Sequence, residues 1–117
     1  QKIDSLLDTF QKNPYSTHGV KDCISMLGEE VYSALIDLEI IVQVSNEIVF
    51  SKSAYQEMVS QVINYIEHNG DMSVAQFRDL FQTSRKYALG FLEKMDLIGV
   101  TFRDGDTRRL LKRRDSQ

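Results

Sequence analysis

Basic side chains gather between residues 83 and 109, in an arrangement that suits the binding of phosphate groups. Arg85 and Lys86 stand together at the expected start of a helix, and Arg103, Arg108 and Arg109 flank the tip of an expected hairpin. Arginine and lysine donate charge-assisted hydrogen bonds to phosphate, and a basic helix start beside a basic hairpin fits a groove or a loop of nucleic acid. The pattern therefore indicates a binding surface.

Phosphate contacts are expected from Arg85, Lys86 and one of the two adjacent arginines, Arg108 or Arg109. Strand alternation sends Arg108 and Arg109 to opposite faces of the hairpin, so one of them meets the ligand. Gly90 falls on the outward side of a helical wheel, where it either lets a ligand backbone approach closely or is a tolerated poor helix former. The complete set of candidate binding residues is Arg78, Thr83, Ser84, Arg85, Lys86, Tyr87, Arg103, Arg108 and Arg109.

The remaining candidates offer polar or aromatic groups beside these cations. Thr83 and Ser84 are N-cap candidates that can offer a hydroxyl or a backbone N–H to the ligand. Tyr87 can stack under an unpaired base as well as pack. Arg78, on the preceding helix, either touches a phosphate or pairs with Asp79. Together these groups predict contacts to bases as well as to the backbone of a nucleic acid.

No pattern of residues predicts catalysis or a bound cofactor. His18 and His68 lie far from any nucleophile pattern, and the chain has no Gly-rich phosphate loop, zinc motif or nucleophile elbow. Cys23 is the single cysteine, so we expect a small buried residue on a helix with no internal disulfide. The prediction is a binding module that is not an enzyme and that holds no cofactor or metal.

Charge is distributed unevenly along the 117 residues, whose net charge is −3. Residues 1–50 carry three cations and eight acids, a net charge of −5, whereas residues 72–117 carry ten cations and six acids, a net charge of +4. The second half therefore attracts nucleic acid and the first half repels it. The run from Lys112 to Arg114 is expected as a solvated tail that adds non-specific attraction. With neither a membrane span nor a secretory pattern, we expect a cytoplasmic piece of a longer protein.

Apolar spacing predicts the same order of elements twice. Residues 1–50 read as three short helices, the third with Leu38 as its last apolar position, followed by a hairpin with a tight turn at Ser45-Asn46. Residues 51–117 read as a helix capped at Ser53, a second helix capped at Ser73, a third helix and a hairpin. When the two halves are aligned, Glu39 of the first matches Asp96 of the second, 57 residues further on. Helix, helix, helix and hairpin is the order of a winged helix, so the predicted fold is mainly α with short β-hairpins, as two tandem winged helices.

The second half resembles a known family. Phe77-Arg78-Asp79, Ser84-Arg85-Lys86-Tyr87-Ala88, Leu92-Glu93, Asp96, Ile98-Gly99-Val100-Thr101, Arg103 and Gly105-Asp106 resemble the last winged helix of SelB, the bacterial selenocysteine-specific elongation factors. Residues 1–71 look like the penultimate winged helix and the first helix of the last one. The resemblance implies that the last winged helix grips an mRNA hairpin through its helix-turn-helix start and wing, and that the full-length protein meets the ribosome. Phe102 departs from the family pattern, which has a second arginine there.

Two other classes of function fit the same residues. The first is a DNA-binding winged helix of a transcription regulator, which predicts a dimer with a preference for duplex DNA. The second is a protein-interaction module whose working surface is the acidic first unit, a unit otherwise expected to be a spacer or docking module. The mRNA-hairpin reading predicts a monomer, because a small basic patch with one aromatic side chain matches a hairpin loop in size.

Overall fold

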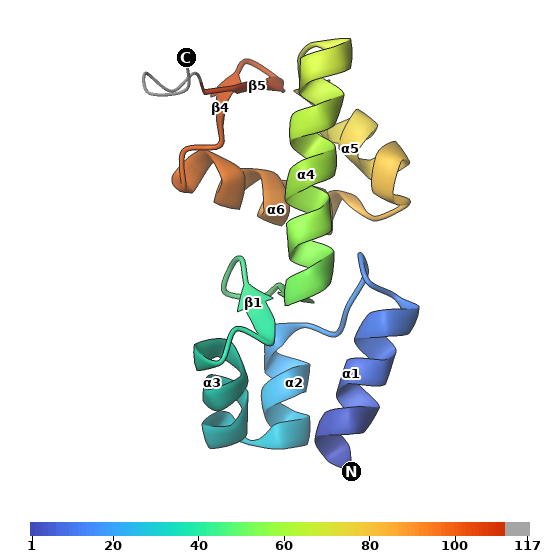
Figure 1. Ribbon diagram of the computed structural model, residues 1–117, viewed down its shortest axis with the longest axis vertical. Coiled ribbons are helices and arrows are strands. Elements are labelled where there is room, and N and C mark those ends of the chain that lie inside the picture. The colour runs from blue at the N-terminus through green and yellow to red at the C-terminus, as the bar shows by residue number, and fades with distance from the viewer. Residues whose placement is uncertain (112–117) are drawn as a thin grey trace. The chain divides into compact units, whose positions relative to one another are not determined.

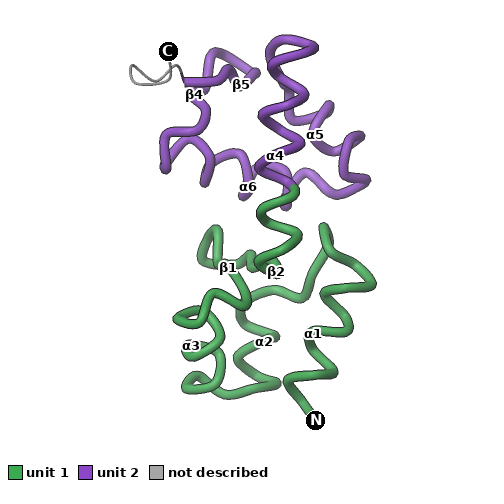
Figure 2. Tube along the Cα trace, viewed as in Figure 1, with its two compact units in different colours: residues 1–57 green, residues 58–117 purple. Residues whose placement is uncertain are grey.

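The chain folds into two compact units, each an α-helical body with a small antiparallel sheet. The computed structural model describes residues 1–111, so the basic run from Lys112 to Arg114 lies outside the described residues. The units are Gln1–Glu57 and Met58–Gln117, and the division falls inside the helix α4 (Lys52–Asn69) (Figure 2). The boundary predicted between residues 50 and 51 lies just before this helix. Across residues 1–111, six helices and two antiparallel sheets confirm the predicted α+β fold class.

The first unit contains three short helices followed by a two-stranded hairpin (Figure 1). The helices are α1 (Lys2–Lys12), α2 (Val20–Leu27) and α3 (Glu29–Asp37). The strands are β1 (Ile41–Gln43) and β2 (Val49–Ser51), which pair in the register 41 with 51, 42 with 50 and 43 with 49. This order matches the prediction for residues 1–50.

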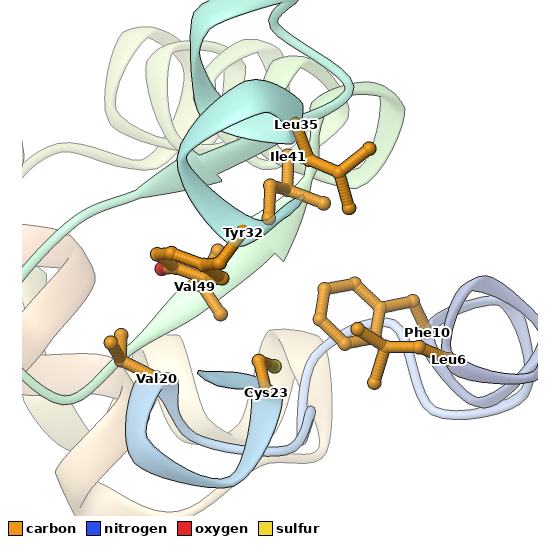
Figure 3. Packing of buried hydrophobic residues seen from close by; sticks show 8 residues of the cluster. All are labelled: Leu6, Phe10, Val20, Cys23, Tyr32, Leu35, Ile41 and Val49. Atoms are coloured by element: carbon orange, nitrogen blue, oxygen red, sulfur yellow. The ribbon is translucent and has the colours of Figure 1, made fainter. Parts of the chain in front are cut away.

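One apolar cluster holds the first unit together, and every element of the unit contributes to it. Figure 3 shows side chains from all three helices and both strands meeting in this cluster. Leu6 and Phe10 come from α1 at a spacing of four, which places both on one face of the helix. The other members are Val20, Cys23, Tyr32, Leu35, Ile41 and Val49. The periodic residues of the sequence thus form the core.

The structure corrects three local predictions. Leu38, expected as the last apolar position of the third helix, is 69% exposed because α3 ends at Asp37 and the chain turns away there. The hairpin turn is longer than Ser45-Asn46, since β1 ends at Gln43 and the Ser45 Oγ accepts from the N–H groups of Glu47 and Ile48. Ser51 rather than Ser53 caps α4, because the Ala54 N–H donates to the Ser51 Oγ and the helix begins at Lys52.

Cys23 is a buried thiol, as the sequence predicts, and its environment makes it unreactive. It is fully buried, and its Sγ donates to the carbonyl of His18 at 3.8 Å. Burial, followed by the nearby charge of Asp22, raises the pKa of Cys23 from 9.0 to about 11. Because only the thiolate reacts, the reactive fraction near pH 8 is lower by about 100-fold than for an ordinary thiol.

We therefore expect native Cys23 to resist a thiol reagent such as Ellman's reagent near pH 8 and to react fully in denaturing urea. The absorbance change with and without urea measures this difference. Complete reaction of the native protein within the mixing time would contradict the buried position of the thiol.

The second unit repeats the order, with one additional strand. The later part of α4 is followed by β3 (Met72–Ser73), α5 (Val74–Phe81), α6 (Arg85–Leu97), β4 (Thr101–Asp104) and β5 (Thr107–Leu110). The strands form one antiparallel sheet in the order β3-β5-β4, so β5 lies in the middle. The short strand β3 was not predicted, because two residues are too few to show a strand period. We call the β4–β5 hairpin the wing.

The second unit has a core of its own, dominated by phenylalanine. Phe77 and Phe81 of α5 and Phe91 of α6 are buried, and the ring centroids of the first two are 4.6 Å apart. Four side chains of α6 are fully buried in this core, namely Ala88, Phe91, Leu92 and Met95. This core fixes α5 and α6 as a helix-turn-helix pair beside the wing.

Candidate nucleic-acid interface

A hollow of about 350 Å³ opens in the second unit between the start of α5, the first turns of α6 and the wing. Its size falls in the range of sites that accept small ligands, about 300–1,000 Å³. Arg85 of α6 and Arg103 of β4 both line it, so two cations that are 18 residues apart in the sequence meet at one site. The residues that line the hollow are Ser73, Val74, Ala75, Arg85, Leu89, Arg103, Asp106 and Arg108.

The start of α6 carries the predicted pair of cations on exposed positions. Ser84 is the N-cap of α6, with an extended backbone, and its side chain makes no capping hydrogen bond. Its hydroxyl is thus available at the helix start, as predicted. Arg85 and Lys86 follow on the first turn and are both exposed. The unpaired N–H groups of the first helical turn add partial positive charge beside these two side chains.

The start of α5 supplies a second helix N-terminus to the hollow. Ser73 caps α5 in a complete capping box, in which the Gln76 N–H donates to the Ser73 Oγ and the Ser73 N–H donates to the Gln76 Oε1. Val74 and Ala75 occupy the first two positions of the helix and line the hollow. The N-terminus of a helix favours negative charge, so α5 reinforces the effect of Arg85 and Arg103.

The two faces of the wing differ in what they present. Arg103 and Arg108 are directly paired across the strands, so their side chains share a face, the one that lines the hollow. Phe102 and Arg109 are paired in the same way on the other face, where the Arg109 guanidinium carbon lies 5.9 Å from the centroid of the Phe102 ring. The three arginines of the wing are therefore divided between two surfaces.

Only one of the two adjacent arginines lies on the face of the hollow, and its charge is already matched. Arg108 is 2% exposed, and its Nε donates to Asp96 at 3.0 Å. Arg109 is exposed, on the outer face, and lies 3.5 Å from both Asp71 and Asp104. The predicted separation of Arg108 and Arg109 to opposite faces is confirmed. Arg103, rather than either of them, gives the hollow its exposed cation on the wing.

The other predicted site residues surround the turn between α5 and α6. Thr83 lies in this turn and is half-buried, and its N–H donates to the carbonyl of Arg78. Arg78 is exposed on α5, and Tyr87 is half-buried on the first turn of α6. Gly90 is buried, so its predicted outward position is wrong, and of the two alternatives the close approach of a ligand does not hold. A helical wheel shows only which side faces the core, and the small surface of a glycine is easily covered by its neighbours.

Five lining residues were not among the sequence-based candidates: Ser73, Val74, Ala75, Leu89 and Asp106. The capping box at Ser73 was visible in the sequence as a helix start, and a helix start is a potential anion site. Nothing in the sequence linked that start to the wing, because their proximity depends on the pairing of β3 with β5.

The two units carry opposite charge at the same position of the fold. The third helix of the first unit begins with Glu29 and Glu30, and the third helix of the second unit begins with Arg85 and Lys86. All four side chains are exposed. A phosphate backbone is attracted to the second of these helix starts and repelled by the first.

Within residues 1–111, no group of three or more His, Cys, Asp or Glu side chains is placed to hold a metal ion. Over the same residues, no helix combines the length and the apolar character needed to cross a bilayer.

A helix-turn-helix with a wing defines a winged helix, and cations on its third helix and on its wing suit the binding of nucleic acid. Residues 64–110 match the family described as "Elongation factor SelB, winged helix". A relative at 33% identity over 84 residues is the selenocysteine-specific elongation factor of Desulfomicrobium baculatum. Over residues 64–110, the second unit is therefore a winged helix of the SelB type. The match covers 72% of this chain and 13% of the relative's length.

Two solved structures share the fold across nearly the whole chain. One is the mRNA-binding domain of elongation factor SelB from E. coli in complex with SECIS RNA, with 23% identity and a TM-score of 0.68, covering 93% of this chain and 98% of that chain. The other is a bacterial selenocysteine-specific elongation factor, EF-Sec, with 18% identity and a TM-score of 0.74, covering 97% of this chain and 18% of that chain. These structures support the tandem winged-helix fold.

Proposed function

We propose that the second unit binds a stem-loop of mRNA, and that it does so as the RNA-binding arm of a selenocysteine-specific elongation factor in the cytoplasm. The observation that carries this proposal is the hollow in which Arg85 and Arg103 meet beside two helix N-termini. The SelB solved structure that shares the fold is described as an mRNA-binding domain in complex with SECIS RNA.

The hollow suits a hairpin loop because it combines cations with one acceptor. Arg85 and Arg103 can donate to phosphate oxygens or to the acceptor atoms of a base, and the carboxylate of Asp106 on the rim can accept from a base N–H. Loop bases are splayed out and can enter such a site, whereas the bases of an A-form stem are out of reach in its narrow major groove. Lys86 and Arg78 lie outside the lining of the hollow and are assigned to the phosphates of the stem.

The hydroxyls of Thr83 and Ser84 and the ring of Tyr87 are assigned to the loop nucleotides beside the α6 start. Arg109 is assigned a minor role, since Asp71 and Asp104 already offset its charge. The first unit, with Glu29 and Glu30 at the corresponding helix start, is assigned a spacer or docking role.

The test is the binding of the chain to a short RNA hairpin carrying the SECIS-type loop, beside a hairpin with a scrambled loop and a DNA duplex, at several salt concentrations. All three affinities fall with salt, so the informative quantity is the gap between the intact and the scrambled loop. We expect a gap of about 100-fold or more. Equal binding to all three would reject the proposal, and a preference for the duplex would favour the DNA-binding alternative.

A further inference from the structure

The carboxylate of Asp96 ties the end of α6 to both strands of the wing. Its Oδ1 accepts from the Thr101 Oγ1 at 2.6 Å, which links it to the first residue of β4. The Arg108 Nε on β5 donates to Oδ2 at 3.0 Å and to Oδ1 at 3.3 Å. A single side chain thus joins three elements.

The partner of Asp96 is one of the few polar side chains buried in the described part of the protein. Arg108 is 2% exposed and Thr101 is 1% exposed. A buried guanidinium needs an opposite charge with good hydrogen-bond geometry, and loss of that partner leaves an uncompensated charge. Arg108 stands on the middle strand, paired with Met72 of β3 and with Arg103 of β4. Asp96 therefore fixes the middle strand of the sheet.

The first unit shows that the fold does not need such a contact to be buried. Glu39, the counterpart of Asp96 in the sequence repeat, pairs with Lys52 at the surface, with side-chain exposures of 71% and 34%. In the second unit the corresponding acid side chain is 26% exposed and its arginine partner is 3% exposed. The ion pair with a buried arginine thus occurs in the second unit, which also carries the hollow.

The buried contact lies directly beside Arg103. Arg103 is the cross-strand neighbour of Arg108, and both line the hollow. Arg85 lies at the first position of α6 and Asp96 at the last but one, so the rigid helix relates the two. We propose that Asp96 is a positioning residue of the RNA interface: through Arg108 and Thr101 it holds the wing on α6 so that Arg103 faces Arg85 across the hollow. This inference rests on the proposed function above.

A second consequence concerns the charge of the hollow. Arg108 lines the hollow, yet its charge is matched by Asp96, so it attracts no phosphate of its own. Removal of the Asp96 charge releases a third cation next to Arg85 and Arg103. Non-specific attraction to RNA then persists or rises, while the geometry that distinguishes one loop from another is lost.

The test is an Asp96→Asn variant of the chain, measured with the intact and the scrambled RNA hairpin. We expect the gap between the two RNAs to shrink by about tenfold or more, with binding to the scrambled hairpin retained. Arg103→Ala should lower affinity for the intact hairpin in the parent chain and have little further effect in the Asp96→Asn background. A purely structural role would lower binding to both RNAs alike and leave the effect of Arg103→Ala unchanged.

The matched control is Glu93→Gln, which makes the same change of charge at an exposed position of α6. Should Asp96→Asn fail to fold, the double variant Asp96→Asn/Arg108→Met leaves no unpaired buried charge and should show the same loss of discrimination. If the parent chain and a folded variant show the same affinity gap between the intact and the scrambled hairpin, the positioning role is overturned and the proposed function stands. A parent chain with no gap between the RNAs overturns both.

Discussion

Replacement of both Arg85 and Arg103 with alanine is expected to lower the affinity for the RNA hairpin by about 100-fold or more, with the fold unchanged. Each charge-assisted hydrogen bond contributes about 1.5–3 kcal/mol, so the loss of two contacts amounts to at least about 3 kcal/mol. Both side chains line the hollow. Titration of labelled hairpin with the parent and the double variant measures the effect, and thermal unfolding by circular dichroism tests the fold.

The salt dependence gives a second, independent measure of the same prediction. If both arginines contact phosphates, the slope of log affinity against log salt falls by about 0.7–0.9 for each, whereas a base contact changes the affinity with little change of slope. The matched control is Lys2→Ala/Lys12→Ala, which removes the same charge from exposed positions of the first unit. An unchanged dissociation constant for Arg85→Ala/Arg103→Ala, or an equal loss in the control, would contradict the assignment of the hollow.

The sequence predicted the elements well because each unit is built from short, strongly periodic helices. Leu6 and Phe10, or Phe77 and Phe81, reveal the buried side of a helix by their spacing alone. The capping box at Ser73 was equally plain, since its residue types satisfy the free N–H groups of the helix start in one specific way. At Ser51 the same reasoning failed, because two serines, Ser51 and Ser53, offer competing cap positions within three residues.

The site was predicted in its residue types but not in its assembly. The cations of α6 and of the wing were evident, yet their meeting in one hollow depends on how the wing packs on α6. Strand alternation placed Arg108 and Arg109 on opposite faces but could not show which face meets the helix. The buried pair of Arg108 with Asp96 decided that question, and it joins residues that are 12 positions apart.

The turn of the wing shows how local sequence can fix such geometry. β4 ends at Asp104 and β5 begins at Thr107, so Gly105 and Asp106 form a two-residue turn. Gly105 has a φ of +64°, at the first central position, where tight hairpin turns require a left-handed backbone. The turn sets the register that pairs Arg103 with Arg108, and through it the face on which Arg103 lies.

Phe77→Ala is expected to unfold the second unit and to abolish RNA binding while the first unit stays folded. Phe77 is fully buried, and its ring centroid lies 4.6 Å from that of Phe81 and 5.4 Å from that of Phe91. Removal of a buried phenylalanine ring costs about 3–5 kcal/mol. A unit of this size has a total free energy of unfolding of about 3–9 kcal/mol. The loss of the ring therefore removes most or all of the stability of the second unit.

Cys23 allows the two units to be followed separately. The thiol is buried in the core of the first unit, whose cluster members all lie within Gln1–Glu57, whereas Phe77 lies in the second unit. In Phe77→Ala, loss of helical signal with an unreactive Cys23 would show that only the second unit has unfolded. The control is Phe102→Ala, at a side chain that is 39% exposed, which should cost less than about 1 kcal/mol. A Cys23 thiol that becomes reactive together with the loss of helix would show that the two cores unfold as one, and a parent-like melting curve would contradict the role of Phe77.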